Sequence, residues 1–375
     1  MYKLSEYPFT LRRILCSFIA TVGALFLLHP ASGCSDSNKG KEEDAGWEET
    51  PDAFIVDGAI DASDGPVDAT TDGSQQIYQD AFVDASPPCY PPENPAGPDV
   101  VLAPPFDNSY AAYDLGQIPG VPASSVLGGC VISYYDENVL LIAVDSESPS
   151  GAIYAVPVVR NACDHIIAFE GTSEKVADTP HIDANLAYGP NNVLFYSQWP
   201  VNMISQLLPG ASSPSSTTDL AALGVGGGGP GGLGFVPPSL PAAGELRILT
   251  WSAGYWYQLS YTPSGDVFTI SSPLHTATVA NGPGGFAYVP EGSPGFSVQS
   301  IIMAEWSNNT VAVYEANSQG DPIEDTRRPF FSAFPRPWGA YFEPETGDYI
   351  FLSWGTGTDR VYIVQGFSRP FTNFH

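Results

Sequence analysis

The sequence predicts an all-β fold, a five-bladed β-propeller preceded by an acidic tether. One passage recurs five times between residues 128 and 367, with its marker aromatic residues at positions 134, 188, 235, 288 and 341. Their mean spacing of about 52 residues is typical of propeller blades. No segment has a convincing helical period, and 38 glycines with 36 prolines argue against long helices.

The chain begins with the features of an export signal. Arg12-Arg13 is followed by an apolar run at residues 14–28 and by the small residues Ala31-Ser32-Gly33, directly before Cys34. This arrangement resembles the lipobox of bacterial lipoproteins, which implies that Cys34 is acylated and becomes the new N-terminus. Residues 1–33 are therefore predicted to be a lipoprotein signal peptide, and Ser35 after the cysteine favours an outer-membrane location. An ordinary secretory signal with a chance cysteine is the alternative.

Residues 34–98 are predicted to be a disordered Asp/Pro-rich tether that holds the domain away from the membrane. Fourteen acidic residues fall between positions 35 and 90 against Lys39 and Lys41, with little apolar surface to offset the entropy of ordering. Asp-Ala-rich stalks of this kind are similar to those of myxobacterial lipoproteins. The alternative, calcium binding, lacks the ligand spacing of an EF-hand loop. The formal charge of −28 excludes nucleic acid as a partner.

Three cysteines remain once the signal peptide and the acylated residue are set aside. They are Cys89, Cys130 and Cys163, and an exported protein can form one disulfide from them. The favoured pair is Cys130 with Cys163, which begin the inner strand and follow the third strand of the first repeat, although Cys89 can take either partner. None has the spacing of a metal or redox site.

Residues 99–375 are predicted to form the propeller. Each repeat supplies four strand signals, and in the second repeat these lie at residues 185–188, 193–197, 202–208 and 216–220. The last repeat ends after a third strand at residues 360–364, and residues 110–115 are the natural donor of its fourth. A ring closed in this way leaves no open sheet edge. Six blades are the alternative.

Two stretches carry a family resemblance. Residues 281–292, Asn-Gly-Pro-Gly-Gly-Phe-Ala-Tyr-Val-Pro-Glu-Gly, resemble the blade signature of NHL, SMP-30/gluconolactonase and streptogramin-lyase propellers, and residues 338–347 are similar. SMP-30 enzymes hold a divalent metal with Glu, Asn and Asp side chains, and Asn281 matches the asparagine position. The resemblance identifies no matching Glu, so no metal ligand set or cofactor is predicted, and a divalent cation in the channel stays an alternative.

The candidate site lies at one mouth of the channel, where the second strands end. Four of these strands end in a tryptophan, and a circle of tryptophan side chains can bind an apolar or sugar face. Large repeated residues also pack between blades, which is the alternative. His181 and Asp183 form a close His/Asp pair that can supply ligands or acid/base chemistry, with an exposed turn as the alternative. The candidate ligand-binding residues are Trp199, Trp251, Trp306, Trp354, Asp145, His181, Asp183, Asn281 and Arg336.

These observations predict a membrane-anchored envelope lipoprotein whose propeller is a ligand-binding or protein-interaction module. Its expected partners are the membrane, through the lipid, and a small molecule, a carbohydrate or an envelope protein. No catalytic motif is found in the sequence. The alternative function is enzymatic: an SMP-30-like metal-dependent lactonase or lyase, or a five-bladed glycoside hydrolase.

Overall fold

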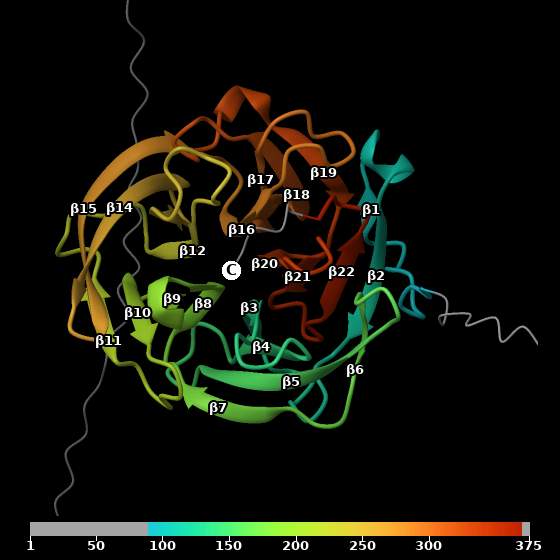
Figure 1. Ribbon diagram of the computed structural model, residues 1–375, viewed down its shortest axis with the longest axis horizontal. Helices are drawn as coiled ribbons and strands as arrows, with labels where there is room; N and C mark the ends of the chain where they lie inside the picture. Colours follow the sequence, from blue (N-terminus) through green and yellow to red (C-terminus); the bar gives the residue numbers. More distant parts are fainter. Residues whose placement is uncertain (1–88, 370–375) are drawn as a thin grey trace, which may run out of the picture. The chain divides into compact units, whose positions relative to one another are not determined.

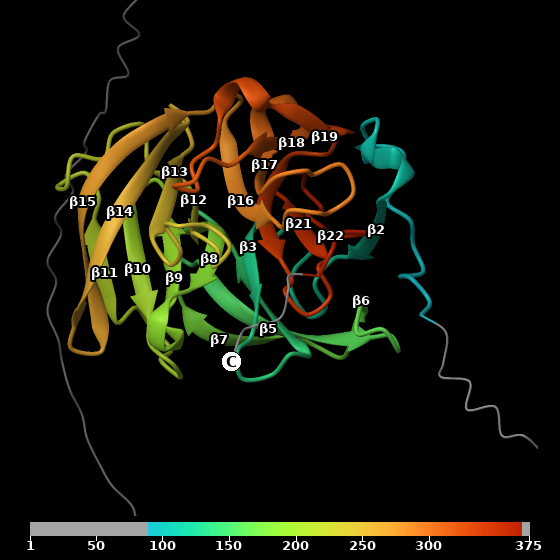
Figure 2. The same cartoon turned by 45° about the horizontal axis from the view of Figure 1, so that its top comes forward.

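A computed structural model describes residues 89–369 of the protein, so the predicted signal peptide, Cys34 and the tether as far as residue 88 lie outside the described residues. Five antiparallel sheets surround a common axis, which confirms the predicted five-bladed propeller (Figure 1). The tilted view in Figure 2 shows that the strands run across the thickness of the ring, with β16 and β3 towards the axis and β15 on the outside.

Each blade begins with a strand at the axis and adds further strands outward. Blade 1 contains β3 (Leu127–Ile132), β4 (Val139–Val144), β5 (Ala152–Arg160), β6 (Ile166–Phe169) and β7 (Glu174–Asp178), the last two both pairing with β5. Blade 2 contains β8 (Ile182–Tyr188), β9 (Leu194–Gln198), β10 (Met203–Leu207) and β11 (Ser216–Asp219). Blade 3 contains β12 (Pro230–Phe235), β13 (Leu246–Thr250), β14 (Tyr255–Ser264) and β15 (Val267–Thr278).

The last two blades each take a strand from the N-terminal part of the domain. Blade 4 contains β16 (Pro283–Val289), β17 (Ser300–Glu305), β18 (Thr310–Glu315), β19 (Arg328–Ala333) and β1 (Val101–Leu102). Blade 5 contains β20 (Pro337–Phe342), β21 (Tyr349–Ser353), β22 (Val361–Gln365) and β2 (Ala111–Gly116). The short helices in the described residues are η1 (Phe106–Asn108), η2 (Pro190–Asn192), η3 (Trp306–Asn308) and η4 (Glu324–Thr326).

The ring is closed by β2, which pairs antiparallel with β22 and places Tyr113 opposite Ile363. This is the closure that the sequence predicts for residues 110–115. The segment before it is held as well, because the backbone of Ala96 donates to Ala112 and that of Asp114 donates to Asn94, both at 2.9 Å. The hydrogen bonding of the domain therefore starts ahead of the predicted boundary at residue 99.

The disulfide joins Cys89 to Cys163, with their Cα atoms 5.4 Å apart, so the predicted Cys130–Cys163 pair is wrong. Cys130 is a buried free thiol in β3, the innermost strand of its blade. Cys163 lies beyond β5, two strands further out, and strands in a sheet are spaced about 4.8 Å apart. That radial separation is too large for a disulfide, which needs Cα atoms within about 7 Å.

The inner strands are rich in glycine because they crowd one another at the axis. A Cβ atom on Gly129 would lie 2.5 Å from the carbonyl oxygen of Ala184 in the next blade, and one on Gly339 would lie 2.3 Å from that of Gly128. Side chains at these positions would force the blades apart.

The buried core consists of five apolar clusters, one at each junction between neighbouring blades. At the junction of blades 4 and 5, ten of the sixteen buried members are Phe or Tyr. At the junction of blades 1 and 2, one of the nine buried members, Tyr196, is aromatic. The junction of blades 1 and 2 is therefore packed mainly by aliphatic side chains.

Within residues 89–369, no helix is long and apolar enough to cross a membrane.

Candidate functional site

The tryptophans that end the second strands are held by the same backbone hydrogen bond in four blades. The backbone N–H of each tryptophan donates to the carbonyl of the residue directly before the inner strand of its blade. The four bonds are Trp199 to His181 at 3.0 Å, Trp251 to Gly229 at 3.1 Å, Trp306 to Gly282 at 3.1 Å and Trp354 to Arg336 at 3.0 Å. This shared geometry directs all four indoles to the same face of the propeller.

The indoles meet there edge to face. Ring centroids are 6.1 Å apart for Trp199 and Trp251, 6.1 Å for Trp251 and Trp306, and 5.8 Å for Trp306 and Trp354. A fifth indole, Trp338, lies 6.5 Å from Trp251 and 5.7 Å from Trp354. We call these five residues the tryptophan layer. The structure thus brings together the four tryptophans that the repeat singles out, and adds Trp338.

Trp338 reaches across the channel. It belongs to β20 in blade 5, yet its indole N–H donates to Oδ1 of Asp183 in β8 of blade 2 at 2.8 Å. In the same strand, Asn185 donates to the carbonyl of Ala340 at 2.8 Å and accepts from the N–H of Phe286 at 3.0 Å. Because these bonds link blades that are not neighbours, they close the centre of the channel, and a ligand at this face would rest on the tryptophan layer.

Three polar atoms in or beneath this layer have no hydrogen-bond partner among residues 89–369. They are Oδ2 of Asp183 and the indole nitrogens of Trp251 and Trp354. The other indole nitrogens are satisfied: that of Trp199, for example, donates to the carbonyl of Gly228 at 2.9 Å. A buried polar group without a partner costs free energy, so a water or ligand group that reached these three buried atoms would stabilise them.

Blade 1 departs from the pattern at Asp145. Val144 pairs with Leu127 just as Gln198 pairs with Ile182, so Asp145 occupies the position of Trp199 in strand register. It has a left-handed φ of 52°, and the equivalent hydrogen bond is made one residue later, from Ser146 to Val126 at 3.1 Å. The extra residue turns the chain, and no indole fills this part of the layer.

Two carboxyl groups lie where that indole is missing. Burial raises the pKa of Glu147 to about 7. Burial, followed by the nearby charge of Glu147, raises the pKa of the fully buried Asp183 well above its usual value. The sequence indicates Asp183 but not Glu147, because a glutamate in a turn carries no periodic signal. Its only sequence cue is its position two residues beyond Asp145.

The remaining predicted residues serve mainly as turns. His181, Asn281 and Arg336 all have left-handed φ values, of 61°, 74° and 45°, immediately before or near an inner strand. The Nδ1 atom of His181 lies 3.2 Å from the carbonyl oxygen of Glu147, and the Arg336 guanidinium lies 5.4 Å from the ring centre of Trp306. These three positions recur because the repeat requires the same turn.

Glu305, which directly precedes Trp306, is part of a buried polar cluster. Its carboxylate accepts from Thr310 at 2.9 Å, from Tyr314 at 2.8 Å and from Arg327 at 2.8 Å. All its strong interactions are internal, so it stabilises blade 4.

In the described part of the chain, no three His, Cys, Asp or Glu residues are grouped to share a metal ion.

No model of a protein family matches the chain, and none of the curated proteins matches it. Solved structures do match. The aldose sugar dehydrogenase of Streptomyces coelicolor in its PQQ-bound form is 14% identical, with 75% of this chain and 99% of that chain covered and a TM-score of 0.39.

Two further structures are similarly distant in sequence. A gluconolactonase of Xanthomonas campestris is 10% identical over 74% of this chain and 98% of its own, with a TM-score of 0.40. A catalytically inactive virginiamycin B lyase of Staphylococcus aureus with quinupristin is 11% identical over 68% and 99%, with a TM-score of 0.32. Gluconolactonase and streptogramin-lyase propellers are the classes that the blade signature resembles. The chemistry of the site follows from the residues of this chain alone.

Proposed function

We propose that the protein is a lipid-anchored envelope protein whose propeller binds a neutral carbohydrate at the tryptophan layer. The observation that carries the proposal is the layer itself, with five indoles in mutual contact and unpartnered hydrogen-bonding atoms among them. The anchor is proposed from the sequence at residues 31–34, which lie outside the described residues.

A sugar ring matches both properties of the layer. Its C–H face packs on an aromatic ring, and its hydroxyls both donate and accept hydrogen bonds. Trp199, Trp251, Trp306 and Trp354 are each half-buried, so part of every one of these indoles faces solvent. The indole nitrogens of Trp251 and Trp354 and Oδ2 of Asp183 are buried without a partner, so a sugar hydroxyl reaches them only when the indoles shift on binding.

Charge favours an uncharged ligand. The chain carries a formal net charge of −28, which disfavours the approach of anions. Arg336 is the cation placed over the layer by its contact with Trp306, and its guanidinium is already bonded to the carbonyl of Gly355. An acidic polysaccharide would meet this charge without a free basic partner in the layer.

A second candidate function, hydrolysis of a glycosidic bond, is favoured by Glu147. A carboxyl group with a pKa of about 7 can gain or lose a proton near neutral pH, as a general acid must. Asp183 lies close enough for the charge of Glu147 to raise its pKa, and pairs of carboxyl groups are typical of glycoside hydrolases. A Glu147→Gln variant distinguishes the two functions, because it would abolish hydrolysis and leave binding within a few-fold.

Calorimetric titration with neutral oligosaccharides tests the binding proposal. Trp251→Ala should weaken binding more than Trp251→Phe, which keeps an aromatic face and loses the N–H at a cost of about 1 kcal/mol, or roughly fivefold in Kd. Tyr90→Ala, at an exposed position outside the layer, is the control and should bind like the parent protein. Unchanged affinity in both Trp251 variants would refute the proposal.

The anchor is tested separately. Replacing Cys34 with Ser should abolish incorporation of labelled palmitate and move the protein from the membrane to the soluble fraction, because stable attachment requires the acyl chains. Cys89→Ser is the matched control, since Cys89 is bound in the disulfide. Palmitate labelling that persists in Cys34→Ser would contradict the anchor.

A further inference from the structure

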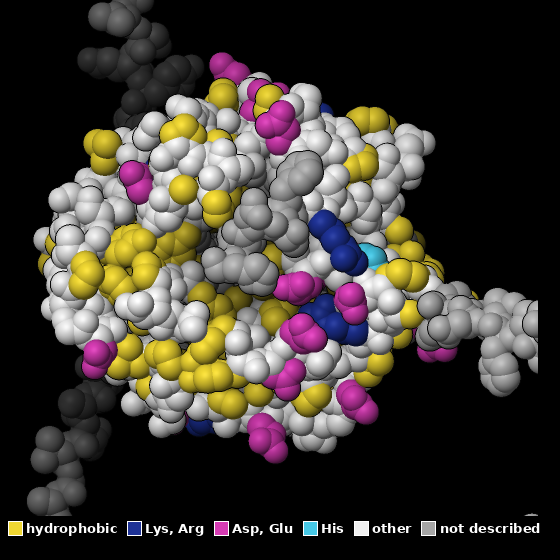
Figure 3. Space-filling model, in the orientation of Figure 1, with side chains coloured by type: hydrophobic (Ala, Val, Ile, Leu, Met, Phe, Trp, Pro, Cys, Tyr) yellow, Lys and Arg dark blue, Asp and Glu magenta, His cyan; other side chains and the backbone are white. Residues whose placement is uncertain are grey.

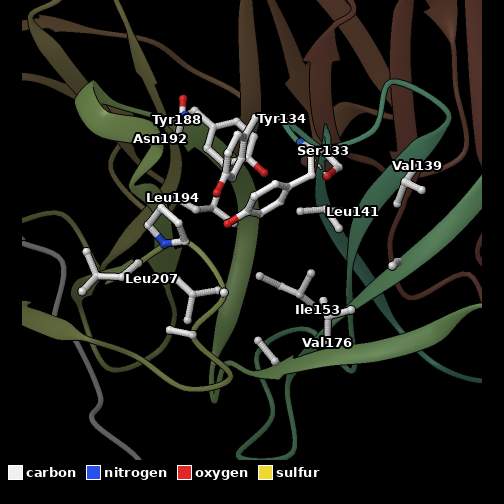
Figure 4. Close-up of a pocket in the computed structure, with 17 residues that line it drawn as sticks. Ser133, Tyr134, Val139, Leu141, Ile153, Val176, Tyr188, Asn192, Leu194 and Leu207 are labelled. Carbon is white, nitrogen blue, oxygen red and sulfur yellow. Dashed lines mark hydrogen bonds between the residues drawn. The ribbon is translucent and has the colours of Figure 1, made fainter.

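A cavity of about 320 Å³ lies between blades 1 and 2 at the opposite end of the inner strands from the tryptophan layer. Figure 4 shows its walls and mouth. The walls are formed by aliphatic side chains from five strands, β4, β5, β7, β9 and β10; they are Leu141, Ile153, Val176, Leu194 and Leu207. In Figure 3, hydrophobic side chains gather over β5 and β7, beside this junction.

Three tyrosines form the mouth. The ring centres of Tyr134 and Tyr135 are 3.8 Å apart, and those of Tyr134 and Tyr188 are 5.3 Å apart with the rings edge to face. In Figure 4 the rings of Tyr134 and Tyr188 stand together at one end of the cavity, near Asn192 and Ser133. Their hydroxyls and the Asn192 amide give this end donors and acceptors, and the far wall has neither.

The cavity exists because the repeat places a smaller residue here. Leu141 pairs with Val131 in blade 1, just as Phe195 pairs with Ala187 in blade 2. At the junction of blades 2 and 3, Phe195 packs against Phe235 with ring centres 5.3 Å apart and leaves the space filled. With leucine in place of phenylalanine, the junction of blades 1 and 2 is left with an apolar space.

The lining determines the chemistry of an occupant. No Asp, Glu, Lys, Arg or His lines the cavity, so a charged group inside would be buried without a partner. The formal charge of −28 further opposes an anion such as a fatty acid. The volume is at the lower end of the range for small-molecule sites, about 300–1,000 Å³. The occupant is therefore small, apolar along most of its length and uncharged at its polar end.

We propose that this cavity is a second binding site, which takes a small uncharged amphiphile with a hydroxyl or carbonyl group at one end. The apolar body packs against Leu141, Ile153 and Leu207, and the polar end bonds at the tyrosine mouth. The site is separate from the tryptophan layer and does not depend on the function proposed for it.

Calorimetry with 1-octanol and octanoate tests this proposal, using the full chain with Cys34→Ser so that acyl groups do not compete. We expect saturable binding of one octanol per chain, and octanoate weaker by about tenfold or more because its charge would be buried. Equal affinity for the two probes, or octanol uptake that does not saturate, would overturn the proposal.

Leu141→Phe fills the cavity with the residue that the next blade uses. It should reduce octanol affinity by about tenfold or more while the protein stays folded by circular dichroism. Leu240→Phe, at a half-buried position of the junction between blades 3 and 4, is the matched control and should bind like the parent. Ala155→Leu fills the cavity from β5 and provides a second test if Leu141→Phe fails to fold. Parental affinity in a folded cavity-filling variant would refute the site.

Discussion

Two junctions of the propeller solve the same packing problem with different side chains. The junction of blades 4 and 5 is filled by Phe and Tyr, including the contacts of Phe351 with Phe331 and Phe334 at 6.1 and 5.9 Å between ring centres. The junction of blades 1 and 2 is aliphatic, holds the cavity at one face and has the Glu147–Asp183 pair at the other. The comparison indicates that a repeat can keep its backbone geometry while one junction gives up packing.

The junction of blades 4 and 5 contains residues from both ends of the domain, where the ring closes. Residues of the N-terminal segment, such as Phe106 and Tyr110, pack into the same cluster as Phe330 and Phe367 near the C-terminal end. Large aromatic side chains bury much apolar area each, which holds together segments distant in sequence. The cluster at the junction of blades 1 and 2 contains no residue of this N-terminal segment, so loose packing there does not weaken the closure of the ring.

The largest expected effect is a difference in the free energy of unfolding between variants at the two junctions. Phe351→Ala should lower the free energy of unfolding by about 3–5 kcal/mol, because a fully buried ring is removed from a dense cluster. Leu194→Ala, on the cavity wall, should cost about 2 kcal/mol, the lower end for leucine, because its surroundings are already incompletely packed. Urea unfolding monitored by circular dichroism measures both. Equal losses would mean that the junctions do not differ in strength.

The disulfide is expected to have the next largest effect. It links Cys89 to Cys163 across 74 residues and ties the N-terminal segment to blade 1. Close to Cys163 in the chain, His165 of blade 1 contacts Asp348 of blade 5 at 2.8 Å. Replacing both cysteines with Ser should lower the free energy of unfolding by roughly 2–4 kcal/mol, because the unfolded chain is no longer crosslinked.

A thiol reductant supplies the control for this prediction. It should lower the melting temperature of the parent protein and leave that of the double variant unchanged. Cys130 is buried and free, so it contributes nothing to this difference. A parent protein insensitive to the reductant would show that the crosslink does not stabilise the ring.

The sequence was sufficient for the blades and for the strand that closes them. Strand alternation and turn residues are local, so the predicted strands of blade 2 agree with β8 to β11 within a few residues. The closing strand at residues 110–115 followed from counting, since the last repeat lacked its outer strand. Fold-level features that depend on local pattern and number are therefore accessible from one sequence.

The candidate site could be predicted only in part, because its contacts depend on residues far apart in the sequence. The bond from Trp338 to Asp183 joins strands of blades that are neither adjacent nor consecutive, and its formation depends on the width of the channel. Glu147 comes close to Asp183 only because an extra residue turns the chain after Asp145. The predicted disulfide was wrong for the same reason, because sequence spacing does not report how far a residue lies from the axis.

The smallest expected effect concerns the carboxyl pair at the junction of blades 1 and 2. The pKa of Glu147 is about 7 in the folded protein against an ordinary value of 4.5, so folding takes up a proton between these pH values. Its contribution to stability is therefore present in full below pH 4.5, falls as the pH rises to 7, and stays low above it. The raised pKa of Asp183 acts in the same direction.

Glu147→Gln removes this dependence. Thermal melts across pH 4.5 to 8 should show no difference from the parent at the acidic end and a more stable variant at pH 8, by roughly 1–2 kcal/mol once the partial exposure of the side chain is taken into account. Glu137→Gln, an exposed glutamate in the same blade, is the matched control and should follow the parent throughout. If Glu147→Gln is instead less stable than the parent at pH 8, the carboxylate is stabilised by its surroundings, and the two junctions differ in packing alone.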